Sequence, residues 1–259
     1  MTKITTKAIR QLKGKRPVVC LTAYDAITAK LASDAGVDLI LVGDSYGTTQ
    51  LGYETTVPVT VDMMLHATAA VVRAKPNSFV IGDVPFAVAH RDAGEVLAIC
   101  ARYLQEAGAD AVKLEGGVEV APIIKKLTDS GIPVVGHIGL LPQQVIQLGG
   151  YRKFGKTQAE QDSLVRDARA LQDAGCFTFV GEMINDEAAR AVSDSVEIPL
   201  IGIGSGPHCD GQVLVSTDML GLNPGKVPSF VKTYANLKED ITKAFAAFAE
   251  DVRERKFPS

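Results

Sequence analysis

The segment Ala107-Gly108-Ala109-Asp110-Ala111-Val112-Lys113-Leu114-Glu115 contains the unit from which the chain is built. It ends a helical pattern at a glycine, continues as a short strand-like run and finishes on a carboxylate. Glycine at the end of a helix suits the left-handed backbone that returns the chain toward a parallel strand. The same exit recurs at Ala35-Gly36-Val37 and Ala174-Gly175-Cys176. The chain therefore repeats a helix, a glycine turn and a strand.

This repeat predicts an α/β fold, a (β/α)8 TIM barrel with an N-terminal helix and C-terminal helices, since strand and helix alternate about eight times in 259 residues. A doubly wound open sheet is the main competitor, but no Gly-x-Gly-x-x-Gly follows the first strand. The expected strands are 18–22, 39–42, 79–81, 111–114, 133–135, 177–180, 199–201 and, more weakly, 213–216. The expected helices include 26–35, 61–73, 93–107, 120–129, 158–174 and a terminal helical region over 229–257.

Composition allows one large domain or two small ones, because 46% hydrophobic residues suffice for one large core. The strand count assigns the whole chain, residues 1–259, to one catalytic barrel domain. The 27 Lys and Arg against 30 Asp and Glu give a net charge of −3, which argues against nucleic acid as a partner. No apolar stretch approaches the roughly 20 residues of a membrane span. The four cysteines form no Cys-x-x-Cys pair and no secretory signal begins the chain, so we expect reduced thiols and a cytoplasmic protein.

Polar residues stand where five of the predicted strands end: Asp44, Asp83, Glu115, His137 and Glu182. Barrel active sites form at this end of the strands. Alternation along a strand places each group on the same face as the residue two positions before it, as Asp44 with Val42 and Ile40. If that face is the barrel interior, the five groups converge at its mouth, with Lys113 one layer below.

Several carboxylates in one apolar pocket resist burial unless a cation accompanies them. Oxygen ligands without cysteine favour Mg²⁺ over zinc. We expect Asp44 and Asp83 to bind the ion, with Glu115 direct or through a water. The plainer alternatives are that single carboxylates cap helices and that Lys113 forms a structural ion pair with Glu115.

Two further features leave alternatives open. His137, a lone histidine, is expected either to contact substrate or to be a satisfied core residue. The loop 149–156 carries three cations and two aromatic residues, and it either holds an anionic substrate or lies in solvent.

A set of strings, in order along nearly the whole chain, resembles the 3-methyl-2-oxobutanoate hydroxymethyltransferase family, also called ketopantoate hydroxymethyltransferase. No single string is specific, but the set is. It comprises Leu41-Val42-Gly43-Asp44-Ser45, Leu51-Gly52-Tyr53-Glu54-Thr55-Thr56-Val57-Pro58-Val59-Thr60, Asp83-Val84-Pro85-Phe86, Val112-Lys113-Leu114-Glu115-Gly116-Gly117, Gly136-His137-Ile138-Gly139-Leu140-Leu141-Pro142-Gln143, Gly149-Gly150-Tyr151, Ile201-Gly202-Ile203-Gly204 and Asp210-Gly211-Gln212.

The resemblance implies a Mg²⁺-dependent enzyme that transfers a hydroxymethyl group from 5,10-methylenetetrahydrofolate to 3-methyl-2-oxobutanoate, giving 2-dehydropantoate for pantothenate and coenzyme A synthesis. It implies a homo-oligomer, typically a decamer. By matching motif, Asp44, Asp83 and Glu115 would bind the metal. Ser45 and Lys113, with the two aspartates, would hold the oxo acid, and Glu182 would accept the proton.

Two strings depart from the family pattern. The run Val180-Gly181-Glu182-Met183-Ile184-Asn185 lacks the aliphatic residue before the glutamate and the Val-Pro after it, which affects the placement of Glu182. The run Gly206-Pro207-His208-Cys209 affects any folate contact there. The alternative functions are a Mg²⁺-dependent carbon–carbon lyase or mutase of the isocitrate lyase and phosphoenolpyruvate mutase type, and a barrel that has lost catalysis. No Lys-Lys-Cys-Gly-His string supports the lyase, and no expected carboxylate is missing.

Overall fold

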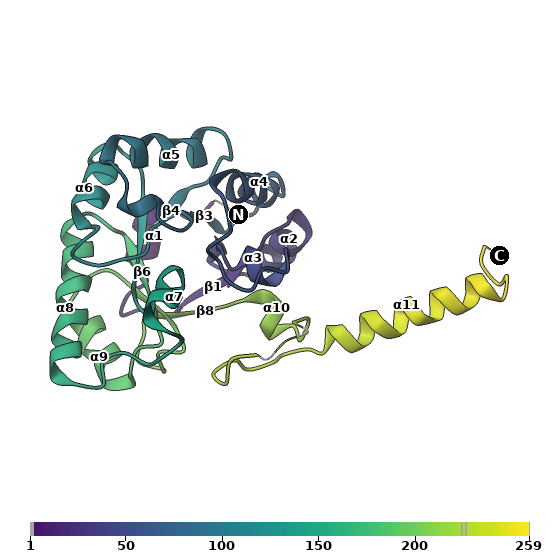
Figure 1. Cartoon of the computed structure of the whole chain (residues 1–259). Coiled ribbons are helices and arrows are strands. Elements are labelled where there is room, and N and C mark those ends of the chain that lie inside the picture. The colour runs from purple at the N-terminus through teal and green to yellow at the C-terminus, as the bar shows by residue number, and fades with distance from the viewer. Residues whose placement is uncertain (1–2, 224, 226, 259) are drawn as a thin grey trace. The chain divides into compact units, whose positions relative to one another are not determined.

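The strands of the computed structural model form a closed parallel barrel in chain order (Figure 1). The structure describes residues 3–223, 225 and 227–258. The fold predicted from the helix, glycine and strand repeat is therefore confirmed. The strands are β1 (Val18–Thr22), β2 (Leu39–Val42), β3 (Phe79–Asp83), β4 (Ala111–Lys113), β5 (Val134–Gly139), β6 (Thr178–Glu182), β7 (Leu200–Ile203) and β8 (Gly211–Leu214).

Backbone pairing fixes the register of the barrel. Each strand pairs in parallel with the next, as Leu39 opposite Phe79 and Gly139 opposite Glu182. Between the last and first strands, the N–H of Val18 donates to the carbonyl of Asp210 over 2.9 Å. The shared direction places all carboxyl ends of the strands at one mouth.

Two apolar layers hold the barrel. Alternate strand residues, such as Leu39, Leu41 and Ile81, pack with one another as one cluster of buried side chains, the barrel interior. The residues between them, such as Ile40 and Val80, join a second cluster that includes the inner faces of the helices. This alternation decides which side chains at the strand ends can reach the mouth.

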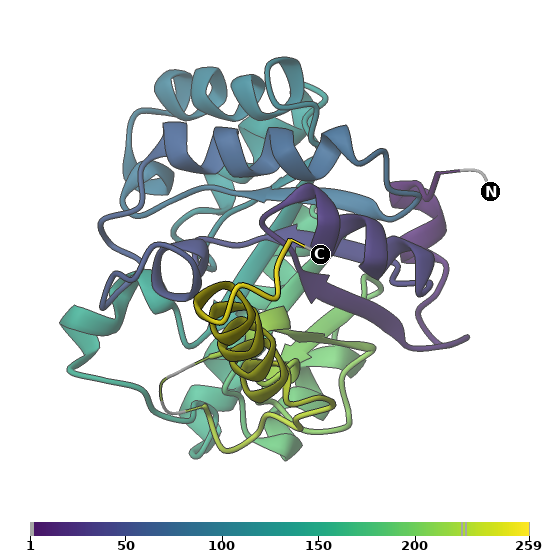
Figure 2. The ribbon, with the colours of Figure 1, turned by 90° about the vertical axis from the view of Figure 1, so that its right-hand side faces the viewer.

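The outer helices cover the barrel, as Figures 1 and 2 show from two directions. Their starts follow capping chemistry: the Asp25 side chain accepts from two N–H groups of the first turn, and Thr60 and Thr157 each accept one. The predicted helices are confirmed to within two residues at each end. They are α2 (Ala26–Asp34), α4 (Val61–Arg73), α5 (Ala93–Gln105), α6 (Ala121–Asp129) and α8 (Gln158–Asp173), with α9 (Asp186–Asp194) beside α8.

Short helices lie before the first strand and in the connections that are longer than the plain helix, glycine and strand repeat. The expected N-terminal helix is α1 (Thr6–Arg10), packed through Ile9. The connection after β2 contains α3 (Tyr46–Thr49), the connection after β5 contains η2 (Pro142–Gln144) and α7 (Val145–Leu148), and η1 (Val88–His90) follows β3. The short helices that follow strands shape the rim of the barrel at the carboxyl ends of the strands.

The chain divides into two compact units, residues 1–213 and 214–259. The second unit contains α10 (Ser216–Met219) and α11 (Leu237–Arg253), the expected C-terminal helix. Within this unit α11 has no buried residue. None of the helices formed by residues 3–223, 225 and 227–258 has the length and apolar character that crossing a membrane requires.

Candidate active site

The structure brings all six predicted polar residues together at the carboxyl ends of the strands. Asp83, Lys113 and Glu182 are the last residues of their strands, and His137 lies within β5. Asp44 and Glu115 lie two residues beyond β2 and β4. Every one except Glu182 is buried, and the Glu182 side chain keeps 15% of its exposure. The mouth of the barrel is thus lined by ionisable groups that are largely shielded from water.

The alternation argument is right for most of these residues and wrong for Asp44. Its strand partners Ile40 and Val42 belong to the layer facing the helices, so Asp44 is out of phase with the barrel interior. The turn after β2 brings it in, because its own N–H donates to Asp83 Oδ2 over 3.0 Å. Gly43 permits this approach, since a Cβ there would lie 3.0 Å from Ser45 Oγ. A turn, and not strand alternation, places Asp44.

Lys113 stands at the centre of the cluster. Its Nζ lies 2.8 Å from Asp83 Oδ1 and 3.7 Å from Glu115 Oε1. The closer partner is therefore Asp83 and not the Glu115 that the ion-pair alternative named. Burial opposes the charge, but Asp83, Glu115 and Asp44 together raise the pKa of Lys113. Lys113 is a fixed positive charge at the base of the mouth.

His137 connects Lys113 to Glu182. Its Nδ1 lies 3.3 Å from Lys113 Nζ, and an ammonium can only donate, so Nδ1 accepts and the ring proton belongs on Nε2. Nε2 in turn lies 3.4 Å from Glu182 Oε2 and makes no hydrogen bond within the described chain. Burial and the nearby Lys113 charge hold the pKa of His137 well below its usual value. His137 is therefore a neutral donor pointing at Glu182.

Sequence reasoning missed Gln143 as a site residue. Its side-chain Nε2 donates to Asp44 Oδ2 over 3.0 Å and to the Val84 carbonyl over 2.9 Å. Its backbone N–H donates to Glu115 Oε2 over 3.2 Å. One buried residue thus orients two of the predicted metal ligands. The available signal was its place at the end of the Gly-His-Ile-Gly-Leu-Leu-Pro-Gln string.

Two tyrosines support the site from outside. The buried Tyr103 of α5 donates its hydroxyl to the Asp83 carbonyl over 2.8 Å. Its ring fits against Gly82, where a Cβ would lie 2.4 Å from the ring. The Tyr24 hydroxyl lies 2.8 Å from Ser45 Oγ, which fixes that half-buried serine beside the mouth.

Glu182, whose neighbours depart from the family pattern, ends β6. Gly181 before it packs closely, because a Cβ there would lie 2.6 Å from Leu200 Cδ1. Met183 after it takes a left-handed backbone with φ 51°. Its N–H donates to the Ile203 carbonyl and its carbonyl accepts from the Phe154 N–H, each over 2.8 Å. These bonds hold a strained residue directly beside Glu182.

Burial shifts the protonation of the carboxylates. It raises the pKa of Asp44 to about 7, with further repulsion from Asp83, and raises the pKa of Glu182 to about 8. It also raises the pKa of Glu115 well above the usual range. The single Lys113 charge lowers each of these values but does not offset the burial.

The residues present fit a divalent cation. Glu115 Oε1 is buried without a hydrogen bond, and four carboxyl groups share one lysine. The donors Asp44, Asp83 and Glu115 are all oxygen ligands, as Mg²⁺ prefers. Within the described part of the chain, no three His, Cys, Asp or Glu side chains come close enough to form a complete cluster of ligands. Mg²⁺ commonly binds through one or two carboxylates and completes its shell with water and substrate oxygens.

The cationic loop 149–156 forms ion pairs with carboxylates of the protein. Arg152 Nη1 bonds Glu160 Oε1 over 2.8 Å, and Lys153 Nζ lies 3.9 Å from Asp186 Oδ1. Tyr151, by contrast, is 70% exposed. Two of the three cations are thus paired within the protein.

Comparison with known proteins agrees with this arrangement. The sequence profile of the family described as ketopantoate hydroxymethyltransferase matches residues 3–259. The chain is 48% identical to the 3-methyl-2-oxobutanoate hydroxymethyltransferase of Thermotoga neapolitana, covering 99% of this chain and 94% of that protein. It is 49% identical to the enzyme of that name from Shouchella clausii, covering 98% and 91%. Both similarities run over nearly the full length.

Solved structures share the fold at low identity. A phosphonopyruvate hydrolase superposes with a TM-score of 0.63 and 16% identity over 98% of this chain and 88% of that one. A 2,3-dimethylmalate lyase of the phosphoenolpyruvate mutase and isocitrate lyase superfamily gives 0.57 and 16%, over 98% and 88%. These likenesses describe the barrel alone. By its sequence over nearly every residue, the chain belongs to the ketopantoate hydroxymethyltransferase family and is a hydroxymethyltransferase.

Proposed function

We propose that the protein transfers a hydroxymethyl group from 5,10-methylenetetrahydrofolate to 3-methyl-2-oxobutanoate, giving 2-dehydropantoate and tetrahydrofolate. Family membership supports hydroxymethyl transfer and a place in pantothenate synthesis. The observation that carries the substrate assignment is the group of four carboxyls near Lys113, of which three are buried and Glu182 is largely so. A small acid that loses a proton next to its keto group needs both a base and positive charge, and this mouth offers them together.

Asp44, Asp83 and Glu115 would hold Mg²⁺. When bound, the ion supplies Lewis-acid polarisation of the 2-oxo acid and offsets its negative charge. A related barrel, phosphonopyruvate hydrolase, is described in complex with oxalate and Mg²⁺. That protein is only 17% identical, so it supports the chemistry by analogy.

The chain's own residues would divide the remaining work. Glu182 would accept the C3 proton, because a carboxylate with a raised pKa is a stronger base than an ordinary one. Lys113 would stabilise the negative charge that develops on the acid. Ser45 would hold the acid, and His137, with its Nε2 proton toward Glu182, would contact the substrate and orient the base.

The lyase or mutase alternative gains no specific support. The solved lyases and mutases share the barrel at 16–18% identity, whereas full-length relatives at 48–49% bear the transferase name.

Exchange of the C3 hydrogen of 3-methyl-2-oxobutanoate in deuterated water, followed by NMR without folate, tests the proposal. Wild type with Mg²⁺ should exchange, EDTA should stop the exchange, and Glu182→Gln should slow it by about 10²- to 10⁴-fold. Glu187→Gln, an exposed neighbour on α9, is the matched control. Full exchange in EDTA, or an unchanged rate in Glu182→Gln, would refute the scheme.

We also propose that the enzyme is a homo-oligomer, a decamer by family resemblance. Support comes from α11, which carries apolar residues along one face and buries none of them within its own unit. A cytoplasmic location is proposed as well, since all four cysteines are free.

A further inference from the structure

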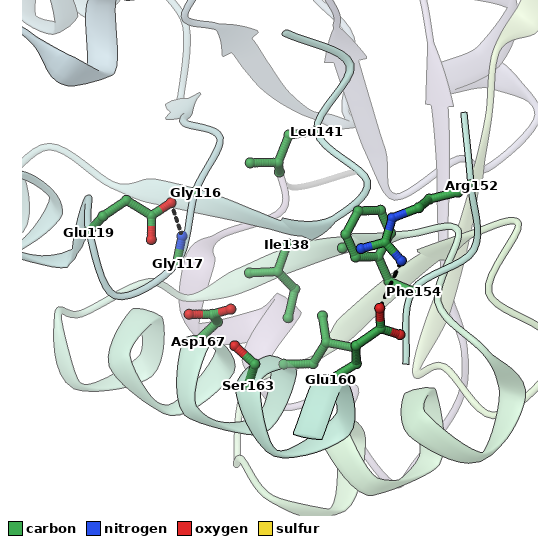
Figure 3. Close-up of a pocket in the computed structure, with 12 residues that line it drawn as sticks. Gly116, Gly117, Glu119, Ile138, Leu141, Arg152, Phe154, Glu160, Ser163 and Asp167 are labelled. Carbon is green, nitrogen blue, oxygen red and sulfur yellow. Dashed lines mark hydrogen bonds and ion pairs between the residues drawn. The ribbon is translucent and has the colours of Figure 1, made fainter. Parts of the chain in front are cut away.

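A cavity of about 240 Å³ lies beside the barrel mouth, outside β4 and β5 (Figure 3). The connection from β4 to α6 forms one wall, and the first half of α8 forms the floor. The segment after α7 closes the other side through Arg152 and Phe154. None of its lining residues is one of the six polar residues predicted for the active site.

The cavity is a near neighbour of the active site along the chain. Its lining residue Gly116 follows Glu115, and Gly139 pairs in register with Glu182. Adjacent strands lie about 4.8 Å apart, so the backbone of the cavity wall is one strand away from the proposed base.

One side of the cavity offers a flat surface. The Arg152 guanidinium lies 3.8 Å from the centre of the Phe154 ring, and Glu160 holds it there through a 2.8 Å bond. Figure 3 shows this stacked pair on the side away from Asp167, with Leu141 and Ile138 between them. Apolar side chains flanked by a stacked cation suit a planar heterocycle.

The other side offers a carboxylate with a free oxygen. Asp167 Oδ1 accepts from the Val118 N–H over 3.1 Å, whereas no donor in the described part of the chain reaches Oδ2. Burial raises the pKa of Asp167. Gly117 is essential to this placement, because a Cβ there would lie 2.2 Å from Asp167 Oδ1. Asp167 therefore lies half-buried against Gly117, and its Oδ2 is still able to accept a hydrogen bond.

Resting on the folate donor proposed above, we propose that this cavity holds the pterin ring, with Asp167 accepting from its amino group and adjacent ring N–H. Two parallel donors on a planar ring match the two oxygens of a carboxylate. The Arg152 and Phe154 pair would lie against the ring. The aminobenzoyl-glutamate part would stay outside, because the cavity is below the roughly 300 Å³ of sites for larger ligands. The carboxylate of Glu119 would repel its anionic tail, whereas Glu160 is paired with Arg152.

Direct binding of 5-formyltetrahydrofolate, measured by calorimetry on the full chain, tests this site. Asp167→Asn should weaken binding by roughly 10- to 100-fold, the effect of losing hydrogen bonds to a charged acceptor. Asp162→Asn, the same change on the exposed side of α8, should bind as wild type does. Tetrahydropterin should displace the ligand, whereas p-aminobenzoyl-glutamate should not.

Unchanged binding in Asp167→Asn, or better competition by p-aminobenzoyl-glutamate than by tetrahydropterin, would overturn the assignment. If Asp167→Asn melts below the assay temperature, Ser163→Phe, which fills the cavity from α8, replaces it and should also lose affinity. The folate-free C3 exchange of the wild type reports on the proposed reaction separately. Exchange without pterin-dependent binding would therefore reject this site alone.

Discussion

At the scale of single residues, Gln143 is the unexpected member of the site. Its amide fixes Asp44 while its backbone N–H fixes Glu115, so one residue sets the spacing of two carboxylates that repel each other. Groups that orient metal ligands in this way commonly change metal affinity by 10- to 100-fold when removed. Gln143 is a positioning residue, since none of its described bonds requires contact with substrate.

Replacing Gln143 with leucine should weaken Mn²⁺ binding by roughly 10- to 100-fold, because Asp44 loses its donor while the backbone bond to Glu115 remains. Electron paramagnetic resonance of free Mn²⁺ measures this directly. Gln147→Leu, on the exposed side of α7, is the matched control. Equal Mn²⁺ affinity in the two variants would show that Gln143 does not orient the ligands.

The raised pKa of Glu182 predicts the pH dependence of proton transfer. The base must be ionised, and its pKa is raised from 4.5 to about 8, so the C3 exchange rate should rise with pH and level off once Glu182 is a carboxylate. NMR exchange rates between about pH 5 and 9 check this. The residual rate of Glu182→Gln should lack the rise. A wild-type rate that is flat over this range would contradict the role.

Sequence reasoning found most of the site residues because strand alternation places them. Asp83, Glu115, His137 and Glu182 follow directly from strand phase. Asp44 is reached through a turn, and Gln143 through a 3-10 turn that the sequence presents only as loop. Periodicity carries no information about such turns, so the hydrogen bonds between them could not be predicted.

At the scale of elements, β3 and α5 show how helix packing supports the site. The Tyr103 ring lies against Gly82 while its hydroxyl bonds the carbonyl of Asp83. Gly82 therefore leaves the space that Tyr103 needs to hold the end of β3.

Gly82→Ala should lower the free energy of unfolding by about 1–3 kcal/mol, because the new Cβ would meet the rigid Tyr103 ring. Tyr103→Phe keeps the ring and should cost only about 1 kcal/mol, the worth of one hydrogen bond. Urea unfolding followed by circular dichroism measures both. A Gly82→Ala protein as stable as wild type would show that the ring moves aside freely.

The element boundaries were predictable where apolar spacing is regular. The first seven strands fall within four residues of their predicted ends, the largest difference being at the end of β5, whereas the last strand lies at 211–214 and not at 213–216. Ser216 instead begins α10. Pairing decides this end: Gly211 stands opposite Ile201 and close to the Val18 carbonyl, a long-range contact that local pattern does not contain.

At the scale of the whole molecule, the second unit exposes an apolar helix face, where we place the proposed contact between copies of the chain. The apolar face of α11 consists of Ile241, Phe245, Phe248 and Val252. Residues spaced by four, three and four share one face of a helix, and such a face is normally covered.

Light scattering after size exclusion should give wild type a mass that is a multiple of 27.4 kDa, ten times that value for a decamer. The double variant Phe245→Lys and Phe248→Lys should lower the mass, because it places charge on the apolar face. Glu250→Lys, on the opposite side of α11, should leave it unchanged. A wild-type monomer, or an undiminished mass in the double variant, would reject this interface.

The turn that carries Asp44 has a consequence for protein engineering. The carboxylates that end β3 and β6 could be transplanted to another barrel as point substitutions, because any parallel strand would present them inward at the same phase. Asp44 could not. It would travel only with its whole loop, from the glycine before it to the serine after it, together with the glutamine that donates a hydrogen bond to it from the neighbouring rim. A graft made residue by residue would therefore deliver an incomplete set of carboxylates.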